Sequence, residues 1–381
     1  MRRGKSGLRH GLAAALLVLG AIVPAASDEL PRATQRDLAA LGLDASILDG
    51  LARQLAVPAA WIEGAKREGK LRVFGTWDAK GDEILSAPFR ERYPFIQLAY
   101  TSATNRQARS TRPLTALRQG RVLADVISGL GANIFAFRDL GALVSVADLP
   151  GYKTLPKDLR DADGLWVSHQ LNYWCLAYNK SRVAPETLPA DWRGLIDAKR
   201  WGDGKIGLGN RPNLWLLPLL GEEGQGWAHD YARDLFAELK PQLRKEGMNA
   251  LIQLLSLGEF DLALPVAQTR LRAVTGKGAD IGWHCPAPVP TAVQTIAIIK
   301  PTPYPNAARL YVNWLLSREG QIAQFLGTGG APIDAALQKP EMLPYAGEIA
   351  GKKQAIRAPN LLEEQEWPSL QAYWDKLWQD R

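Results

Sequence analysis

Long hydrophobic runs and blocks of basic residues are both scarce in this chain of 381 residues. A membrane-spanning helix needs about 20 consecutive apolar residues, and after the apolar run at residues 11–23 no second stretch comes close to that length. Lysine and arginine are scattered among aspartate and glutamate, without a basic block or a basic stripe interleaved with aromatic residues. We therefore expect neither an integral membrane protein nor a nucleic-acid-binding protein.

Cysteine and histidine are also rare, with two cysteines and four histidines in the whole chain. Apart from one histidine in the leader, His169, His229 and His284 are far from one another in sequence and from any cysteine pair at metal-ligand spacing. A zinc site or another His/Cys metal centre is therefore not expected. Cys175 and Cys285 form either a disulfide or two small buried thiols, and the residues alone do not decide between them.

The first 27 residues have the pattern of a secretory signal peptide. Basic residues precede the apolar run and small residues follow it, namely Arg2, Arg3, Lys5 and Arg9, then Ala25, Ala26 and Ser27. The apolar residues that follow a twin-arginine pair are missing, so the general secretory route is the default. No cysteine follows the run to carry a lipid anchor. We expect a free periplasmic protein, whose net charge falls from +7 to +3 when the four basic residues of the leader are removed.

The remainder of the chain predicts two α/β units, because roughly 350 residues exceed what one hydrophobic core usually organises. A prologue at residues 28–57 has helical spacing of its leucines. A short strand, a polar loop and a helix then recur three times, which is typical of a parallel sheet covered by helices. The expected units are 58–172 with 287–335 as one lobe, 173–286 as the other, and a helical segment at 336–381 whose lobe is undecided.

Several short segments carry a family resemblance. They are AKREGKL at 65–71, FRERYP at 89–94, ADV at 124–126, AYN at 177–179, GEFD at 258–261, PNAA at 305–308 and LLSREGQ at 315–321. In this order and spacing the chain resembles the periplasmic solute-binding proteins of bacterial ABC importers, in particular the branch that includes ferric-iron binders.

The resemblance implies an α/β, two-lobed type II periplasmic-binding-protein-like fold, with a hinge of two extended crossings. It also implies a monomer without a cofactor or catalytic residues, which captures a small solute between its lobes and passes it to an ABC transporter permease in the inner membrane. In relatives the crossing strands are neighbours, so the resemblance allows a disulfide between Cys175 and Cys285 at the hinge.

A bare ferric ion does not suit the residues of this chain. Ferric binders of the branch have two adjacent tyrosines just after the Gly-Glu-x-Asp segment, because phenolate is a hard anionic donor for a hard trivalent cation. The corresponding positions here include Gln268 and Thr269, and no two tyrosines are adjacent anywhere in the chain. Direct metal binding is therefore not expected, while a ferric or iron-complex binder remains an alternative.

Ligands of open α/β sheets bind beyond the carboxyl ends of the strands, so the loops after the predicted strands supply the candidates. Together with one residue of the hinge strand, the predicted ligand-binding residues are Thr76, Trp77, Asp78, Ser102, Thr104, Asn105, Arg106, Ser128, Gly129, Tyr173, Asn210, Arg211 and Gln268. The same loops contain Asn133, Asn213, Thr269 and Arg270, outside this set. Neutral donors and arginine near helix N-termini suit an anionic or zwitterionic ligand with a carboxylate, phosphonate or phosphate group.

Competing structural roles stay open for most of these residues. Ser102, Thr104 and Asn105 are suited to cap helices as well as to bind a ligand. Arg106 and Arg211 either contact the ligand or lie in solvent, paired with a carboxylate.

The aromatic candidates are open in the same way. Trp77 either stacks on a ligand or belongs to the core. On the hinge strand, alternation sends one of Tyr173 and Trp174 toward the cleft, and we prefer Tyr173.

Two rival functions remain. A periplasmic hydrolase or lyase would use Asp78 or His169 as its base, although no Gly-x-Ser-x-Gly elbow, paired histidine ligands or phosphate-cradling loop supports it. A sensor that presents the solute to a membrane receptor would use the same cleft, and the residues do not separate it from an importer.

Overall fold

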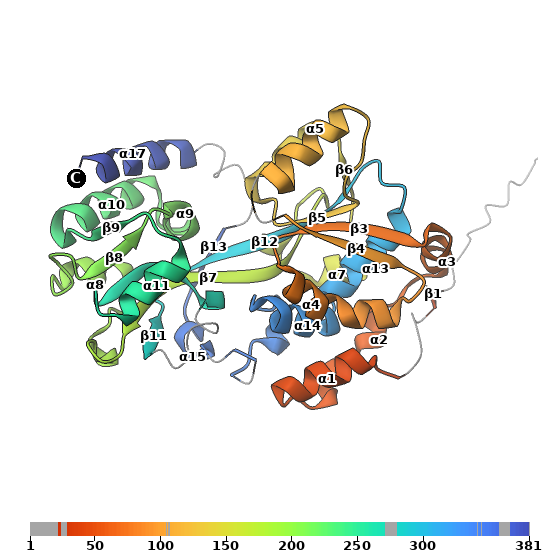
Figure 1. Ribbon diagram of the computed structural model, residues 1–381, viewed down its shortest axis with the longest axis horizontal. Helices are drawn as coiled ribbons and strands as arrows, with labels where there is room; N and C mark the ends of the chain where they lie inside the picture. Colours follow the sequence, from red (N-terminus) through yellow and green to blue (C-terminus); the bar gives the residue numbers. More distant parts are fainter. Residues whose placement is uncertain are drawn as a thin grey trace, which may run out of the picture.

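The computed structural model describes residues 22–23, 29–103, 105, 107–270, 280–340, 342–343, 345–357 and 366–380. Nearly all of the predicted signal peptide, and the candidates Thr104 and Arg106, lie outside these residues. Two bodies of helices and strands are joined by long strands that run between them (Figure 1). Lobe 1 contains β3 (Lys70–Gly75), β4 (Gln97–Ser102) and β5 (Val126–Ser128), and lobe 2 contains β8 (Ile206–Gly209), β9 (Gln242–Arg244) and β10 (Leu262–Ala267).

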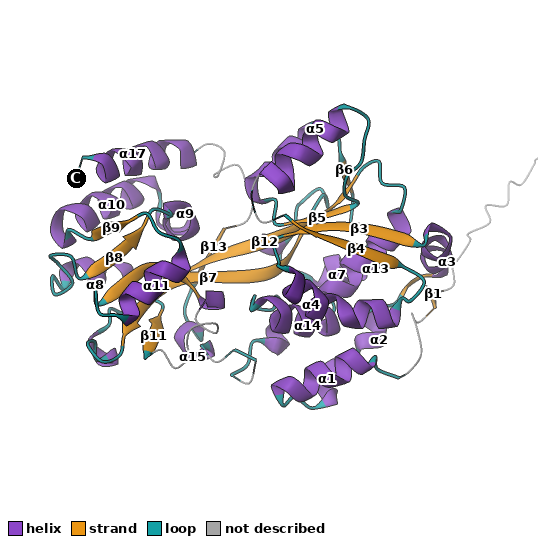
Figure 2. Cartoon of the chain, viewed as in Figure 1, coloured by secondary structure: helices purple, strands orange, loops and turns teal. Residues whose placement is uncertain are grey.

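The sheet of lobe 1 is parallel where the sequence predicts repeated strand–loop–helix units. β3 pairs in parallel with β4 on one edge and with β5 on the other. Helices lie on the outside of these strands (Figure 2). The main ones are α3 (Ala59–Glu68), α4 (Ala79–Arg92), α13 (Pro305–Leu316) and α14 (Arg318–Thr328), of which α13 packs on α3 and α14 on α4. Asp78 caps α4 by accepting a hydrogen bond from the Gly81 N–H at 2.8 Å, which fixes the start of this helix shortly after β3 ends at Gly75.

A buried ion pair fastens the N-terminal extension to lobe 1. Arg92 of α4 donates from Nε and Nη2 to the two carboxylate oxygens of Glu319 in α14, at 2.7 Å each. Thr34 donates to the same carboxylate at 2.7 Å, and Thr34 belongs to α1 (Arg32–Leu41). The rest of the extension comprises η1 (Ala45–Leu48), α2 (Leu51–Gln54) and β2 (Val57–Pro58), and β2 pairs with β1 (Ile22–Val23).

The strand β7 (Val167–Asn179) belongs to both lobes. On one edge it pairs with β12 (Val289–Ile299) up to Tyr173 and with β11 (Ile281–His284) from Leu176 onward. On the other edge Leu171 pairs with Ala331 of lobe 1, and β10 of lobe 2 takes over from Trp174. Eleven strands are therefore connected through β7 and β12. This confirms the expected two-lobed α/β fold with extended crossings.

A disulfide lies at these crossings. Cys175 of β7 is bonded to Cys285, which directly follows β11, and both residues are fully buried. Of the two alternatives that the sequence leaves open, a disulfide or two buried thiols, the structure therefore has the disulfide.

Lobe 2 has an aromatic core. Its helices are α8 (Trp192–Asp197), α9 (Pro212–Glu223), α10 (Gln225–Leu239) and α11 (Met248–Ser256). Trp192, Trp215 and Trp374 are at most 1% exposed, and their rings lie 5 to 7 Å from aromatic neighbours. Much of the chain's tryptophan therefore stabilises this lobe rather than lining a cleft.

The C-terminal segment adds a third strand to the crossing. After α15 (Ala346–Ile349), β13 (Gln354–Arg357) pairs in parallel with residues 289–292 of β12. The last helix, α17 (Trp367–Gln379), packs on α9 and α10 of lobe 2. The segment whose lobe the sequence leaves undecided thus runs along the crossing strand β12 and ends against helices of lobe 2.

The remaining elements are short: η2 (Gln107–Thr111), α5 (Arg112–Arg118), η3 (Gly131–Asn133), α6 (Ile134–Asp139), β6 (Leu143–Val144), α7 (Pro150–Thr154), η4 (Lys157–Leu159), η5 (Pro185–Thr187) and η6 (Ala335–Leu337). Within the described ranges, no helix combines the length and apolar character that crossing a bilayer requires.

Candidate binding cleft

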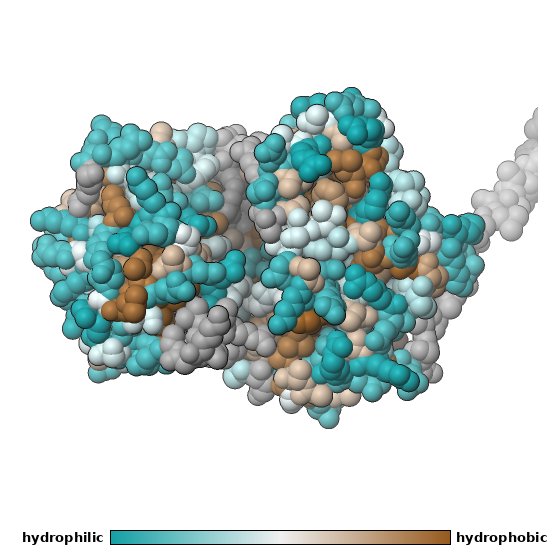
Figure 3. Space-filling view, viewed as in Figure 1, coloured by the Kyte–Doolittle hydropathy of each residue, from teal (hydrophilic) through white to brown (hydrophobic). Residues whose placement is uncertain are grey.

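A cavity of about 600 Å³ lies between the lobes and takes its walls from both of them. An indentation between the two halves is visible on one face of the molecule (Figure 3). The lining residues come from lobe 1, from the crossing strands and from lobe 2: Thr76, Trp77, Asp78, Gln170, Asn172, Trp174, Arg211, Gly247, Met248, Asn249, Ala267, Thr269, Arg270, Gln294, Gly327 and Thr328. Their mixed origin means that a change in the angle between the lobes changes the cavity.

The wall of lobe 1 is formed where β3 ends and α4 begins. Thr76 accepts a hydrogen bond from Gln294 Nε2 at 2.6 Å, and Asp78 is exposed. Trp77 lines the cavity but is only 6% exposed, because its ring stacks on Tyr100. Most of the surface of Trp77 is therefore buried in the core, which is one of the two roles that the sequence leaves open for this residue.

The floor of the cleft is the hinge strand β7. Gln170, Asn172 and Trp174 lie two residues apart and line the cavity together, as alternation along a strand requires. Tyr173 points the other way, is fully buried and packs edge-on against Tyr345. The preference for Tyr173 over Trp174 was therefore wrong, because both are aromatic and the residue types do not reveal which face of the strand meets the cleft.

The wall of lobe 2 carries the positive charge of the cleft. Arg211 and Arg270 are exposed and line the cavity. Neither guanidinium has an ion-pair or hydrogen-bond partner among the residues that the structure describes. The helix α11 begins at Met248, and its N-cap residue Gly247, which also lines the cavity, supplies no side-chain cap. Unpaired guanidinium groups next to a helix N-terminus favour an anionic ligand.

Several predicted residues do not line the cleft, and some of them support the fold instead. Ser102 is exposed at the end of β4, outside the cavity lining. Asn105 accepts a hydrogen bond from the Ala108 N–H at 2.9 Å, which is the capping role. Asn210 accepts from Trp374 Nε1 at 2.9 Å and so anchors α17 to lobe 2. The Asn105 and Asn210 side chains are thus already hydrogen-bonded and Ser102 lies outside the cavity lining, so all three are poorly placed to bind a solute.

Gly129 supports the lobe 1 wall from behind. Its φ is +74°, and a Cβ at this position would lie 2.9 Å from Thr76 Cγ2 and 3.0 Å from Gln294 Nε2. Only glycine fits both the backbone conformation and the space. Gly129 therefore sets the position of two lining residues without lining the cavity itself.

A buried polar network lies under the lobe 1 wall. Ser128 Oγ is 2.8 Å from His169 Nε2, and His169 Nδ1 is 2.5 Å from Gln324 Oε1. The Gln324 amide nitrogen donates to the His169 carbonyl, so Gln324 Oε1 accepts the proton of Nδ1, and the Ser128 hydroxyl donates to Nε2. Burial, partly opposed by the bond to Gln324, lowers the pKa of His169 to about 4.

His169 is thus neutral, fully buried and occupied at both ring nitrogens. It has no open path by which to act as a general base on a molecule in the cleft. Asp78, the other proposed base, already caps α4.

The cleft contains residues that the candidate set omitted. Gln170, Asn172, Trp174, Asn249, Gln294, Thr328, Thr269 and Arg270 line it. Alternation along β7 and β12 predicts Gln170, Asn172, Trp174 and Gln294 once the cleft face of those strands is known. Thr269 and Arg270 directly follow the predicted residue Gln268, which is 1% exposed and does not line the cavity.

No metal site is evident in the described part of the chain, where no three histidine, cysteine, aspartate or glutamate side chains are grouped to hold an ion. Of the described residues that line the cleft, Asp78 is the only carboxylate, and none is a tyrosine or histidine.

Comparison with known proteins gives a family and a fold. Residues 87–351 match the family model described as bacterial extracellular solute-binding protein. Among solved structures, iron-bound HitA from Pseudomonas aeruginosa has a TM-score of 0.63 at 20% identity and covers 80% of this chain and 99% of its own. An ABC transporter substrate-binding protein from Bradyrhizobium japonicum has a TM-score of 0.65 at 17% identity, covering 81% and 99%.

A Trichodesmium protein (IdiA, FutA) in complex with iron and citrate is similar to the same degree, with a TM-score of 0.65, 17% identity, and coverage of 81% and 99%. At these identities the structures establish a shared fold. No curated protein matches the sequence.

Proposed function

The chain belongs to the family of bacterial extracellular solute-binding proteins, and we propose that it captures a small anionic or zwitterionic solute in the cleft between its lobes for an ABC importer. In this proposal the protein acts as a periplasmic monomer, with 58–172 and 287–335 as lobe 1 and 173–286 as lobe 2. The closed, loaded form docks on the permease.

One observation carries the proposal: a cavity of about 600 Å³ whose walls belong to two bodies connected by extended strands. A site divided between two such bodies is completed when they rotate together, so binding and closure are linked. Capture by closure needs no bond-making step. The buried, neutral state of His169 and the capping role of Asp78 are consistent with binding in place of catalysis.

The class of solute follows from the charges. Arg211 and Arg270 give lobe 2 two positive charges in the cleft, neither of them paired with a described residue, whereas Asp78 of lobe 1 is the only carboxylate among the described lining residues. Amide and hydroxyl side chains make up most of the other polar groups. A carboxylate, phosphonate or phosphate group on the solute would satisfy the arginines, and a positive group on a zwitterion would face Asp78.

Iron in complex with an organic anion is the second candidate, because one similar structure contains iron and citrate. A bare ferric ion suits the cleft poorly, since Asp78 is the only hard anionic donor among its described lining residues. An anionic iron complex would instead be held through its outer carboxylates by the arginines.

The test is a thermal-shift screen of the mature protein with phosphate esters, phosphonates, amino acids, polyamines, citrate and ferric citrate. A ligand that binds only the folded state raises the unfolding temperature by mass action. We expect stabilisation by at least one anionic or zwitterionic compound. Stabilisation by polyamines alone would contradict the assigned charge class, and turnover of a stabilising compound would contradict capture without chemistry.

Arginine substitutions then test the site. Arg211→Ala and Arg270→Ala are each expected to weaken binding of the stabilising anion by about 1.5 to 3 kcal/mol, the usual contribution of a hydrogen bond to a charged group. Arg67→Ala is the matched control, because Arg67 is exposed on α3, away from the cleft. Equal affinities for all three variants and the wild type, measured by calorimetry, would remove the arginines from the site.

A further inference from the structure

Both edges of β7 change partner within a few residues. On one edge Ala331 of lobe 1 pairs with Leu171, and β10 of lobe 2 begins at Trp174. On the other edge β12 pairs as far as Tyr173, and β11 begins at Leu176. The residues from Leu171 to Leu176 are thus where the backbone hydrogen bonds pass from one lobe to the other. Rotation of the lobes must be accommodated at this point.

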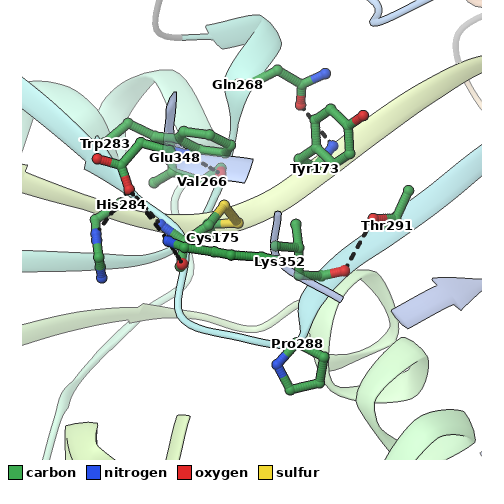
Figure 4. The surroundings of a disulfide bond; sticks show 12 residues. Tyr173, Cys175, Val266, Gln268, Trp283, His284, Pro288, Thr291, Glu348 and Lys352 are labelled. Carbon is green, nitrogen blue, oxygen red and sulfur yellow. Dashed lines mark hydrogen bonds and ion pairs between the residues drawn. A yellow bond between two sulfur atoms is a disulfide. The ribbon is translucent and has the colours of Figure 1, made fainter. Parts of the chain in front are cut away.

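The side chain of Gln268 bridges the first of these gaps. Gln268 directly follows β10, and its Oε1 accepts a hydrogen bond from the Tyr173 N–H at 2.8 Å. Its Nε2 donates to the Leu171 carbonyl at 3.3 Å. Figure 4 shows the amide turned toward Tyr173. The side chain is 1% exposed, so it continues the hydrogen bonding of β10 along β7 across the gap between the two lobes.

The second gap is bridged covalently. Cys175 lies between the last pairing with β12 and the first with β11, and it is bonded to Cys285. The C-terminal segment holds Cys285 in turn, because Lys352 Nζ donates to its carbonyl at 2.7 Å. The disulfide and these contacts hold the lobe 2 end of the crossing together (Figure 4).

Gln268 is also connected to the cleft on both of its sides. Thr269 and Arg270, the next residues along the chain, line the cavity, and so do Asn172 and Trp174, which flank Tyr173. A solute that draws Arg270 toward lobe 1 therefore pulls on the residue that holds β7 at the change of partner.

We propose that Gln268 is a positioning residue that fixes the pivot of lobe closure and couples it to contacts at Arg270. This rests on the proposed function only in taking closure to be the response to a solute. The amide holds β7 at one edge and the disulfide holds it at the other, so rotation is confined to the short segment between them. Without the amide, one edge of the pivot is free and the lobes sample a wider range of angles.

The test measures the distance between the lobes in solute-free protein. Spin labels at Arg118→Cys on α5 and Gln225→Cys on α10 report this distance, because both residues are exposed and lie on different lobes. Gln268→Met keeps the side-chain volume and removes both hydrogen bonds. We expect a wider distance distribution by pulsed electron resonance than in the labelled wild type.

Gln321→Met is the matched control. Gln321 is fully buried, donates to the His169 and Leu315 carbonyls and accepts from the Ile333 N–H, all within lobe 1. Both variants are expected to lower the unfolding temperature, but only Gln268→Met is expected to widen the distribution. If the two variants have the same width as the wild type, Gln268 has a structural role alone and the proposal is overturned.

A rescue variant separates the hydrogen bonds from general packing. A protonated glutamate at position 268 accepts from the Tyr173 N–H and donates to the Leu171 carbonyl, whereas an ionised one cannot donate. Burial raises the pKa of a carboxyl group at this position, so Gln268→Glu should give a narrow distribution at mildly acid pH that widens once the pH is high enough to ionise the carboxyl, while Gln268→Met stays wide throughout. A distribution of Gln268→Glu that stays as wide as that of Gln268→Met at mildly acid pH would contradict the assignment. None of these measurements needs a solute, so they stand whether or not the proposed function holds.

With a stabilising solute in hand, the coupling itself is measurable. Gln268→Met should weaken the affinity for the solute by about tenfold, the equivalent of one or two hydrogen bonds. The reason is that the interlobe angle that binds the solute is a smaller fraction of a wider range of angles. An affinity equal to that of the wild type would overturn the coupling.

Discussion

The pH dependence of stability provides a sharp test of the polar network under the cleft. His169 has a pKa of about 4 in the folded protein, well below its ordinary 6.5, because burial disfavours the charged ring. Between these values the unfolded chain binds a proton at this position and the folded chain does not. The free energy of unfolding therefore falls as the pH drops from 6.5 toward 4.

The size of the effect follows from the same two values. At about 1.4 kcal/mol for each pH unit, the difference between 6.5 and about 4 corresponds to roughly 3 kcal/mol of stability lost across this window. His169→Gln removes the titrating group. We expect the variant to be less stable at neutral pH, because Ser128 and Gln324 lose their partner, but to lose less stability on acidification.

Urea unfolding followed by tryptophan fluorescence, at several pH values from about 7 to about 4, gives both curves. The wild type and His169→Gln contain the same carboxylates, so their contribution to the pH dependence cancels in the difference between the two curves. What remains is the contribution of His169. Parallel curves would show that His169 is protonated in the folded protein or accessible to solvent. In that case the assignment of a neutral ring between Ser128 and Gln324 fails, and His169 becomes available as a base again.

Two further predictions concern stability. Glu319→Ala leaves Arg92, whose side chain is 5% exposed, without its counter-charge and should cost about 3 to 5 kcal/mol. Lys66→Ala breaks the exposed ion pair between Lys66 and Glu63 and should cost about 1 kcal/mol or less, so comparable losses in urea unfolding would contradict the buried pair. Replacing both Cys175 and Cys285 by alanine opens a loop of 110 residues and should lower the free energy of unfolding by about 4 to 5 kcal/mol. A urea-unfolding midpoint equal to that of the wild type would mean that the disulfide does not constrain the unfolded chain.

The sequence predicts the framework of lobe 1 well, because its signals there are local. Polar loops after short apolar strands identify the end of β3, so Thr76, Trp77 and Asp78 are found at the cleft. Arg211 is found in lobe 2 by the same rule. The carboxyl end of a parallel strand is fixed by its own residues and the helix that follows, so nothing distant is needed to place these side chains.

Residues whose partners lie far away in the chain could not be assigned. Ser128, Asn210 and Gln268 are polar residues in the expected loops, yet they bind His169, Trp374 and the backbone of β7. A hydroxyl or amide group serves a distant buried partner or a solute equally well. Which of the two it meets depends on the tertiary structure.

The hinge strand shows a second limit. β7 is buried along most of its length on both faces, so polar and apolar residues do not alternate along it clearly enough to identify the cleft face. The loop after β10 shows a related limit. Its residue types do not separate Gln268, which is 1% exposed, from Arg270, which is exposed and lines the cavity.

The position of the arginines explains why closure should depend on a solute. Arg211 and Arg270 lie on lobe 2 and are open to water in this structure. Closing the cleft around them without a counter-ion removes two like charges from water, which is unfavourable in a low-dielectric interior. With an anionic solute in the cleft, the electrostatic contribution to closure becomes favourable, because the same loss of water strengthens the attraction between the solute and both guanidinium groups. In the proposed mechanism the solute therefore interacts more favourably with the closed form than with the open one, and this difference is the only means by which a ligand shifts such an equilibrium.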